Sequence, residues 1–299
     1  MLTYGNHFVG KRNVYGLSSR EWVNYDYFYA LIDPTTNKPW ISPYAEPYRS
    51  TAKELDGVYS ANDFYFKGYN PGDPPTGGKS FSIDIRYDNA VNAKCMFRAN
   101  YISSIPENSF NNVIYAEEMF GGDYSNDKLT TIPSGSFNKV INGHEMFRNR
   151  TNISSIGENS FHDLEDAGFM FLRDYALTGI PSNMFNNVID AYGMFNMPIN
   201  FDIPSGYSHL TYLGDNIFNR LENGNGLFND CHELLNLPEN SFSSLTNAHG
   251  MFGACSALTS NLIPFITSHP NITSHSECFH YCSAAGDYNQ AKALYPDWF

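Results

Sequence analysis

Cysteine and histidine residues near the C-terminus are the first candidates for chemistry, because stacked thiols could bind a metal or form a disulfide. Three thiols each follow a phenylalanine by three residues: Cys231, Cys255 and Cys282. Cys278, His280 and Cys282, with His275 close by, could in principle hold zinc, but their spacing matches no standard zinc finger. The regular placement favours small buried core residues instead. We therefore expect no metal site and no cofactor.

Two loop segments resemble ligand-binding motifs without meeting their requirements. Residues 72–80 (GDPPTGGKS) nearly form a phosphate loop, but the spacing departs by one residue and two prolines remove amide donors. A linker is the favoured interpretation. Residues 123–127 (DYSND) resemble the start of a calcium loop, yet Lys128 stands where glycine is required and no glutamate follows at the twelfth position. A solvated loop is favoured there.

Composition excludes several classes of protein. The 299 residues carry a formal net charge of −13, which repels phosphate backbones and anionic lipids. We therefore expect no nucleic-acid partner and no membrane insertion. No apolar run approaches the ~20 residues that span a bilayer. The nine histidines show no arrangement with serine, cysteine or aspartate typical of a catalytic site, so we expect no enzyme activity.

A repeat of about 24 residues organises the chain from residue 81 onward. Its clearest mark is a residue followed directly by phenylalanine: Met96, Met119, Met146, Met170, Met194, Leu227, Met251 and Cys278. A second phenylalanine stands nine residues before most of these pairs: Phe110, Phe137, Phe161, Phe185, Phe218 and Phe242. One repeat reads L-x-x-I-P-x-N-S-F-N-N-V-x-x-A-x-x-M-F. Apolar residues at fixed places in every repeat predict stacked turns with a continuous core.

Each part of the repeat has an expected structure. The L-x-x-I segment predicts a short strand in a parallel ladder, ended by proline, which cannot donate a ladder hydrogen bond. The N-S-F-N-N segment is typical of a turn. The V-x-x-A-x-x-M-F segment has helical spacing and predicts one or two helical turns on the convex side.

Three regions follow from this pattern. Residues 1–80 do not repeat and are expected to form a small, mostly β attachment or capping module, with a Pro/Gly linker at 70–80. Residues 81–286 are expected to form a solenoid of about seven to eight turns. Residues 287–299 have a helical pattern, and Leu294, Trp298 and Phe299 are available to cover the open end.

The later repeats resemble a known family. The segments FNDCHEL (228–234) and MFGACSALT (251–259) are similar to the M-F-x-x-C-x-x-L-T pattern of BspA-like leucine-rich repeats from bacteria, mycoplasmas and their phages. The resemblance covers roughly residues 81–282, although the cysteine is replaced in early repeats by Asn100, Asp123, Arg150, Asp174 and Pro198. It implies an α/β, right-handed leucine-rich-repeat-like solenoid used for adhesion, host contact or assembly, with no catalytic residues.

Candidate contact residues lie on the expected surface. Tyr124, Phe201, Tyr207 and Tyr212 stand in or beside insertions between repeats, where aromatic side chains often anchor a partner, although they could equally pack on the edge of the turns. A Ser/Thr series between the Leu and Ile positions could form a polar stripe for a glycan or peptide. Simple β-propensity on an exposed sheet is the favoured explanation of that series.

These observations favour a non-catalytic binding protein. The first residues, MLTYGNHFVGKRNVYG, do not look like a signal peptide, because they lack an apolar segment and a small-residue cleavage site. With the resemblance to repeats of bacteria, mycoplasmas and their phages, this favours a virion component such as a fibre, decoration or tail-associated adhesin, held in an oligomeric assembly. Its partner would be a protein or glycan on a host surface, or a neighbouring subunit. A bacterial surface or secreted adhesin is the alternative, and an enzyme is the remote one.

Overall fold

The computed structural model describes these residues: 29–33, 38–41, 53–54, 81–82, 93–94, 102–122, 128–198 and 208–299. Most of the N-terminal module and the whole 70–80 linker therefore lie outside the described residues. Within the module, β1 (Tyr29–Asp33) pairs antiparallel with β2 (Lys38–Ile41) and with β3 (Lys53–Glu54). The strand order is β2-β1-β3.

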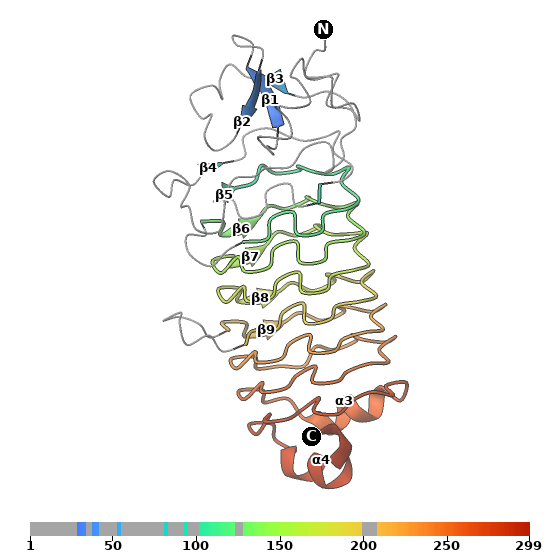
Figure 1. Cartoon of the computed structure of the whole chain (residues 1–299). Coiled ribbons are helices and arrows are strands. Elements are labelled where there is room, and N and C mark those ends of the chain that lie inside the picture. The colour runs from blue at the N-terminus through green and yellow to red at the C-terminus, as the bar shows by residue number, and fades with distance from the viewer. Residues whose placement is uncertain are drawn as a thin grey trace.

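From residue 102 onward the chain runs through turns that lie one on another (Figure 1). We number the first six turns by their buried phenylalanines, from turn 1 with Phe110 to turn 6 with Phe242. Short strands mark one side of the stack: β4 (Phe81–Ser82), β5 (Ile102–Ser104), β6 (Thr131–Ile132), β7 (Ser155–Ile156), β8 (Gly179–Ile180) and β9 (Tyr212–Leu213). They pair in parallel as β4-β5, β6-β7 and β8-β9. β6 and β8 end directly before a proline, which removes the next donor.

The segment V-x-x-A-x-x-M-F is not helical in the described turns, so the expected convex helix is wrong. Its backbone N–H groups bond to carbonyls of the next turn, as in Ala116 N to Asn142 O (2.8 Å) and Phe120 N to Met146 O (2.8 Å). Parallel bridges join these positions through seven successive turns: Tyr115, Asn142, Asp166, Asp190, Asn223, Asn247 and Ser274. A donor bonded to the neighbouring turn is not available for an i−4 carbonyl, so the helix does not form.

Two ladders of phenylalanine rings fill the interior, and the predicted burial of the repeated apolar residues is confirmed. In one ladder the rings of Phe120, Phe147, Phe171, Phe195, Phe228, Phe252 and Phe279 stack with centroids 5.2–5.7 Å apart. The other ladder contains the phenylalanine that numbers each turn. Each stacked pair contributes about 0.5–1.5 kcal/mol beyond the area it buries.

The phenylalanine that numbers each turn has a left-handed backbone. Its φ lies between 54° and 62° in all six turns. Such a conformation costs about 1–2 kcal/mol for a residue other than glycine. Complete burial of the ring, worth about 1.5–3 kcal/mol, offsets that cost and directs the side chain into the core.

Helices close the C-terminal end of the stack. α3 (Leu262–Ser268) begins where the Asp287 carboxylate accepts the N–H groups of Leu262 (2.7 Å) and Ile263 (2.9 Å). α4 (Tyr288–Leu294) and the 3-10 helix η3 (Pro296–Trp298) follow. Trp298 is buried against the last phenylalanine of the ladder, whereas Leu294 is 58% exposed and does not cover the end as expected. No helix in the described part of the chain is long and apolar enough to cross a membrane.

Candidate functional site

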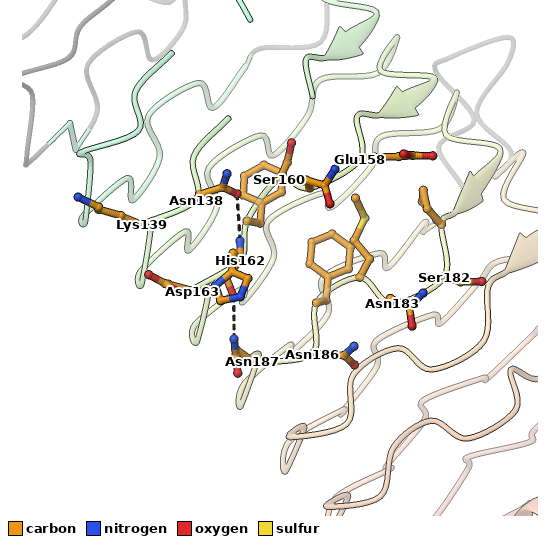
Figure 2. Close-up of a pocket in the computed structure, with 15 residues that line it drawn as sticks. Asn138, Lys139, Glu158, Ser160, His162, Asp163, Ser182, Asn183, Asn186 and Asn187 are labelled. Atoms are coloured by element: carbon orange, nitrogen blue, oxygen red, sulfur yellow. Dashed lines mark hydrogen bonds and ion pairs between the residues drawn. The ribbon is translucent and has the colours of Figure 1, made fainter. Parts of the chain in front are cut away.

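A groove of about 820 Å³ lies between turns 3 and 4 (Figure 2). Its walls are residues 158–163 of turn 3 and residues 181–187 of turn 4, with residues 138–139 of turn 2 at one end. Phe161, Met184 and Phe185 are buried beneath it. Polar side chains occupy its exposed rim: Glu158, Asn159, His162, Asp163, Ser182 and Asn183.

The groove exists because the two turns are not bonded along this edge. Turns 2 and 3 are joined by Gly135 N to Glu158 O and by Asp163 N to Asn138 O, both at 3.0 Å. Among the described residues, no backbone hydrogen bond joins 154–163 to 178–187, and β7 does not pair with β8. One side-chain bond crosses the gap, from Asn187 Nδ2 to the His162 carbonyl oxygen (2.8 Å).

The first reason for the opening is a serine position that turn 4 lacks. The residue before the numbering phenylalanine is Ser160 in turn 3, and its hydroxyl donates to Pro133 O of turn 2 (3.1 Å). The same hydroxyl accepts the N–H of Ser136 (3.4 Å). Turn 4 has Met184 at this position, which cannot make either bond.

The second reason is an asparagine position that turn 3 lacks. The residue after the numbering phenylalanine is Asn138 in turn 2, and its Oδ1 accepts the N–H of the next turn (3.4 Å). Asn186 of turn 4 does the same for Asn219 N (3.2 Å). Turn 3 has His162, whose Nδ1 lies 2.6 Å from Asp163 Oδ1 instead of reaching turn 4.

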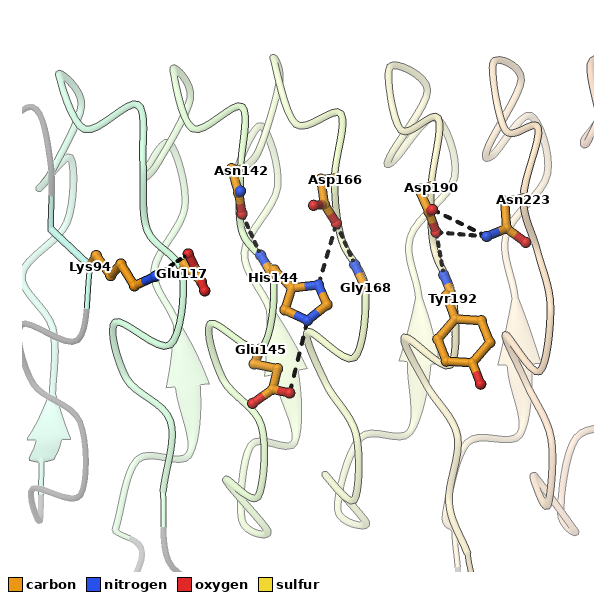
Figure 3. Close-up of polar contacts among 10 residues, drawn as sticks. All are labelled: Lys94, Glu117, Asn142, His144, Glu145, Asp166, Gly168, Asp190, Tyr192 and Asn223. Atoms are coloured by element: carbon orange, nitrogen blue, oxygen red, sulfur yellow. Dashed lines mark hydrogen bonds and ion pairs between the residues drawn. The ribbon is translucent and has the colours of Figure 1, made fainter.

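The opposite edge of the same two turns is closed by backbone hydrogen bonds, and Figure 3 shows side-chain contacts along this edge. Ala167 N bonds to Asp190 O (2.8 Å), and Phe171 N bonds to Met194 O (2.9 Å). The Asp190 carboxylate also accepts the backbone N–H of Tyr192, two residues later (2.9 Å). It accepts the side-chain amide of Asn223 as well, at 3.1 Å to each oxygen.

The groove presents chemistry suited to binding. Amides and hydroxyls offer donors and acceptors close together, and the His162–Asp163 pair adds one imidazole and one carboxylate. The His162 side chain is 75% exposed and the Asp163 side chain 49% exposed, so both can be reached from solvent. Ser160 is unsuited as a nucleophile, because its hydroxyl points into turn 2.

The cysteines lie in the interior. The thiols of Cys231, Cys255 and Cys282 donate to phenylalanine carbonyls of the preceding turn at 3.4, 3.3 and 3.0 Å. Arg150, at the equivalent position of turn 2, donates its Nε to Phe120 O in the same way. Burial raises the pKa of Cys231 and of Cys282 to about 12, so both remain protonated thiols at neutral pH. Among the described residues, no cluster of three or more His, Cys, Asp or Glu could hold a metal ion.

The contact residues predicted from the sequence do not line this groove or lie outside the residues that the structure describes. Tyr212 is 52% exposed on β9, with its ring beside Gly179. Tyr124, Phe201 and Tyr207 lie outside the described residues. Hydroxyls of the Ser/Thr series form hydrogen bonds between turns, as in Thr211 Oγ1 to Thr178 O (3.1 Å). These hydroxyls therefore help to hold neighbouring turns together.

Sequence reasoning did not select the groove residues. The available signal was a departure from the repeat, because His162 replaces an asparagine found in four of the other five numbered turns and Met184 replaces a serine found in four of them. Comparison of the chain with known protein families, with curated proteins and with solved structures found no match.

Proposed function

We propose that this chain is a non-catalytic binding protein whose turns form a right-handed, leucine-rich-repeat-like solenoid. The groove between turns 3 and 4 is its contact site for a partner on a host surface or in a neighbouring subunit. In this proposal the protein is a virion component, such as a fibre, decoration or tail-associated adhesin. The support for this location is the resemblance to repeats found in bacteria, mycoplasmas and their phages.

One observation carries the proposal: the exposed, polar groove lies on a stacked scaffold whose described thiols are buried. The rim offers amides, hydroxyls and the His162–Asp163 pair to solvent. Ser160 bonds to turn 2, Ser182 Oγ accepts the N–H of Asp215, and the described thiols are buried. A site that offers contacts but no activated nucleophile supports recognition without turnover.

The test is binding of labelled protein to an array that carries both glycans and extracellular proteins, with His162→Ala compared with the unaltered chain. We expect this variant to weaken the strongest signal at least fivefold. His209→Ala is the matched control, because His209 is also an exposed histidine beside a carboxylate (3.4 Å from Glu233 Oε2) but lies outside the groove. Equal loss in both variants, or turnover of substrates in a hydrolase panel, would contradict the proposal.

The virion location has a separate test. Mass spectrometry of purified particles should find the chain in fixed proportion to the other structural proteins. Recovery of the chain only as a free monomer from the cell interior would contradict this part while leaving the binding function open to the array.

A further inference from the structure

A second groove opens on the same edge of the stack, between turn 6 and α3. Its volume is also about 820 Å³, and its lining runs from Leu237 in turn 6 to His269 after α3. The groove forms because α3 stands where the next turn would place its N-S-F-N-N segment. Phe265 meets Phe242 at 65° with centroids 6.2 Å apart, in place of flat stacking. His269 spans the gap, with Nε2 3.0 Å from Ser241 O.

Both grooves have one wall of identical sequence. Residues 158–161 and residues 239–242 both read Glu-Asn-Ser-Phe. The backbone is the same as well, since φ is 56° at Asn159 and 49° at Asn240. In both walls the glutamate and asparagine are exposed. The same polar groups are therefore presented in the same arrangement at two places.

The serine of this shared wall accepts a backbone N–H in both grooves, although Ser160 donates to Pro133 O and Ser241 to Glu239 O. Ser160 Oγ accepts the N–H of Ser136 (3.4 Å), and Ser241 Oγ accepts the N–H of Ile217 (3.0 Å). Both bonds run to the preceding turn. The wall is thus anchored from behind, and the exposed glutamate and asparagine are left to face the groove.

The facing walls agree in chemistry. Ser182 and Asn183 face the first groove, and Ser260 and Asn261 face the second. Neighbouring hydroxyl and amide groups suit a ligand whose own groups both donate and accept, as carbohydrate hydroxyls do. Known modes of peptide binding use an open sheet edge, an apolar groove or an arginine cluster. Neither lining contains an arginine or a strand residue, and the aromatic rings beneath both grooves are buried.

We propose that the two grooves are two subsites for one neutral polysaccharide with a repeating unit, which runs along this edge from turn 3 to α3. This inference rests on the proposed binding function and names its ligand class. The two walls are three stacking steps apart, and the numbering rings at those steps are separated by 6.1, 5.3 and 6.0 Å. A short fragment therefore occupies a single groove, whereas a longer chain reaches both and gains avidity from the linked contacts.

The experiment begins with an array of neutral polysaccharides and continues by calorimetry with size-fractionated fragments of the strongest ligand. The variants are Asn159→Gly and Asn240→Gly, since glycine adopts positive φ without strain and removes only the amide. Asn108→Gly is the matched control, because Asn108 has φ 54° in the same Glu-Asn-Ser-Phe sequence. Its Oδ1, however, fills the space over Gly135 of the next turn.

The unaltered chain should bind two short fragments, and each groove variant should retain one tight site. For the long chain we expect either groove variant to lose tenfold or more in affinity and the control to lose none. One short fragment per unaltered chain, or a long-chain affinity that Asn240→Gly leaves unchanged, would overturn the two-subsite proposal and leave the first groove standing. Binding of array proteins but of no polysaccharide would overturn the ligand class alone. Failure of the proposed binding function would look different from these two outcomes. In that case His162→Ala would weaken no signal on the array of glycans and extracellular proteins.

Discussion

Turns 3 and 4 meet along two edges that differ in almost every contact. On the closed edge, the Phe171 and Phe195 rings stack with centroids 5.2 Å apart and an interplanar angle of 4°. Backbone hydrogen bonds join Ala167 N to Asp190 O and Phe171 N to Met194 O. On the open edge, Phe161 and Phe185 lie 6.1 Å apart at 27°, with no backbone bond between the described segments. One bonded edge therefore suffices to keep the turns in register. The other edge is free to open a groove at two altered positions, His162 and Met184.

The largest expected effect is loss of a closed-edge ring. Phe171 is fully buried and stacks almost flat on both Phe147 and Phe195, so Phe171→Ala should lower the free energy of unfolding by about 3–5 kcal/mol. Phe185→Ala on the open edge should fall at the low end of that range, because its stacked rings depart from parallel by 27° and 21°. Urea denaturation measures both, and a larger loss for Phe185→Ala would reverse the comparison.

The next effect tests the dry interior behind the closed edge. The pKa of the Cys231 thiol is raised by burial from 9.0 to about 12. Above pH 9 the unfolded chain releases the thiol proton while the folded chain retains it, so stability is complete below pH 9 and falls as pH rises toward 12. The slope should be about 1.4 kcal/mol per pH unit for each such thiol. Unfolding of the native chain and of Cys231→Ala, measured from pH 8 to 11, should differ in slope, and parallel curves would show that the interior is wet.

A smaller effect concerns the polar contacts of the closed edge. Asp190 accepts hydrogen bonds from Tyr192 N and from the Asn223 amide, so Asp190→Ala should lower the free energy of unfolding by about 1–3 kcal/mol. Glu158→Ala is the open-edge counterpart, and its exposed side chain predicts a change within about 0.5 kcal/mol. Thermal denaturation followed by circular dichroism compares them. Similar shifts for the two variants would mean that the polar ladder contributes little.

A small gain in stability, rather than a loss, should come from restoring the missing asparagine. In His162→Asn the new Oδ1 can accept Asn186 N, as Asn138 Oδ1 accepts the N–H of residue 162. We expect a gain of about 0.5–1 kcal/mol from this bond, together with weaker ligand binding as the walls draw together. Denaturation and array binding should therefore move in opposite directions. A variant that is more stable and binds unchanged would separate the groove from the site of contact.

The strands and the core were the parts of the fold that sequence could predict. β6 to β9 lie within the expected L-x-x-I segments, and the repeated Ile, Phe, Val and Met-Phe positions are buried. The candidate site could not be predicted in the same way. Its residues are common Asn, Ser and His side chains. The groove forms because hydrogen bonds between turns 3 and 4 are missing, and the residue types alone do not reveal this.

The amino-acid sequence by itself determined which side chains leave water, because hydrophobicity belongs to the residue and its period repeats along the chain. Only the tertiary structure decided where the backbone donors go. The spacing of V-x-x-A-x-x-M-F suits a helix, yet carbonyls of the next turn lie within 3 Å of Ala116 N and Phe120 N and take their place. The groove was decided likewise, since it depends on the fit of His162 and Met184 to turns that are about 24 residues away in sequence but adjacent in space.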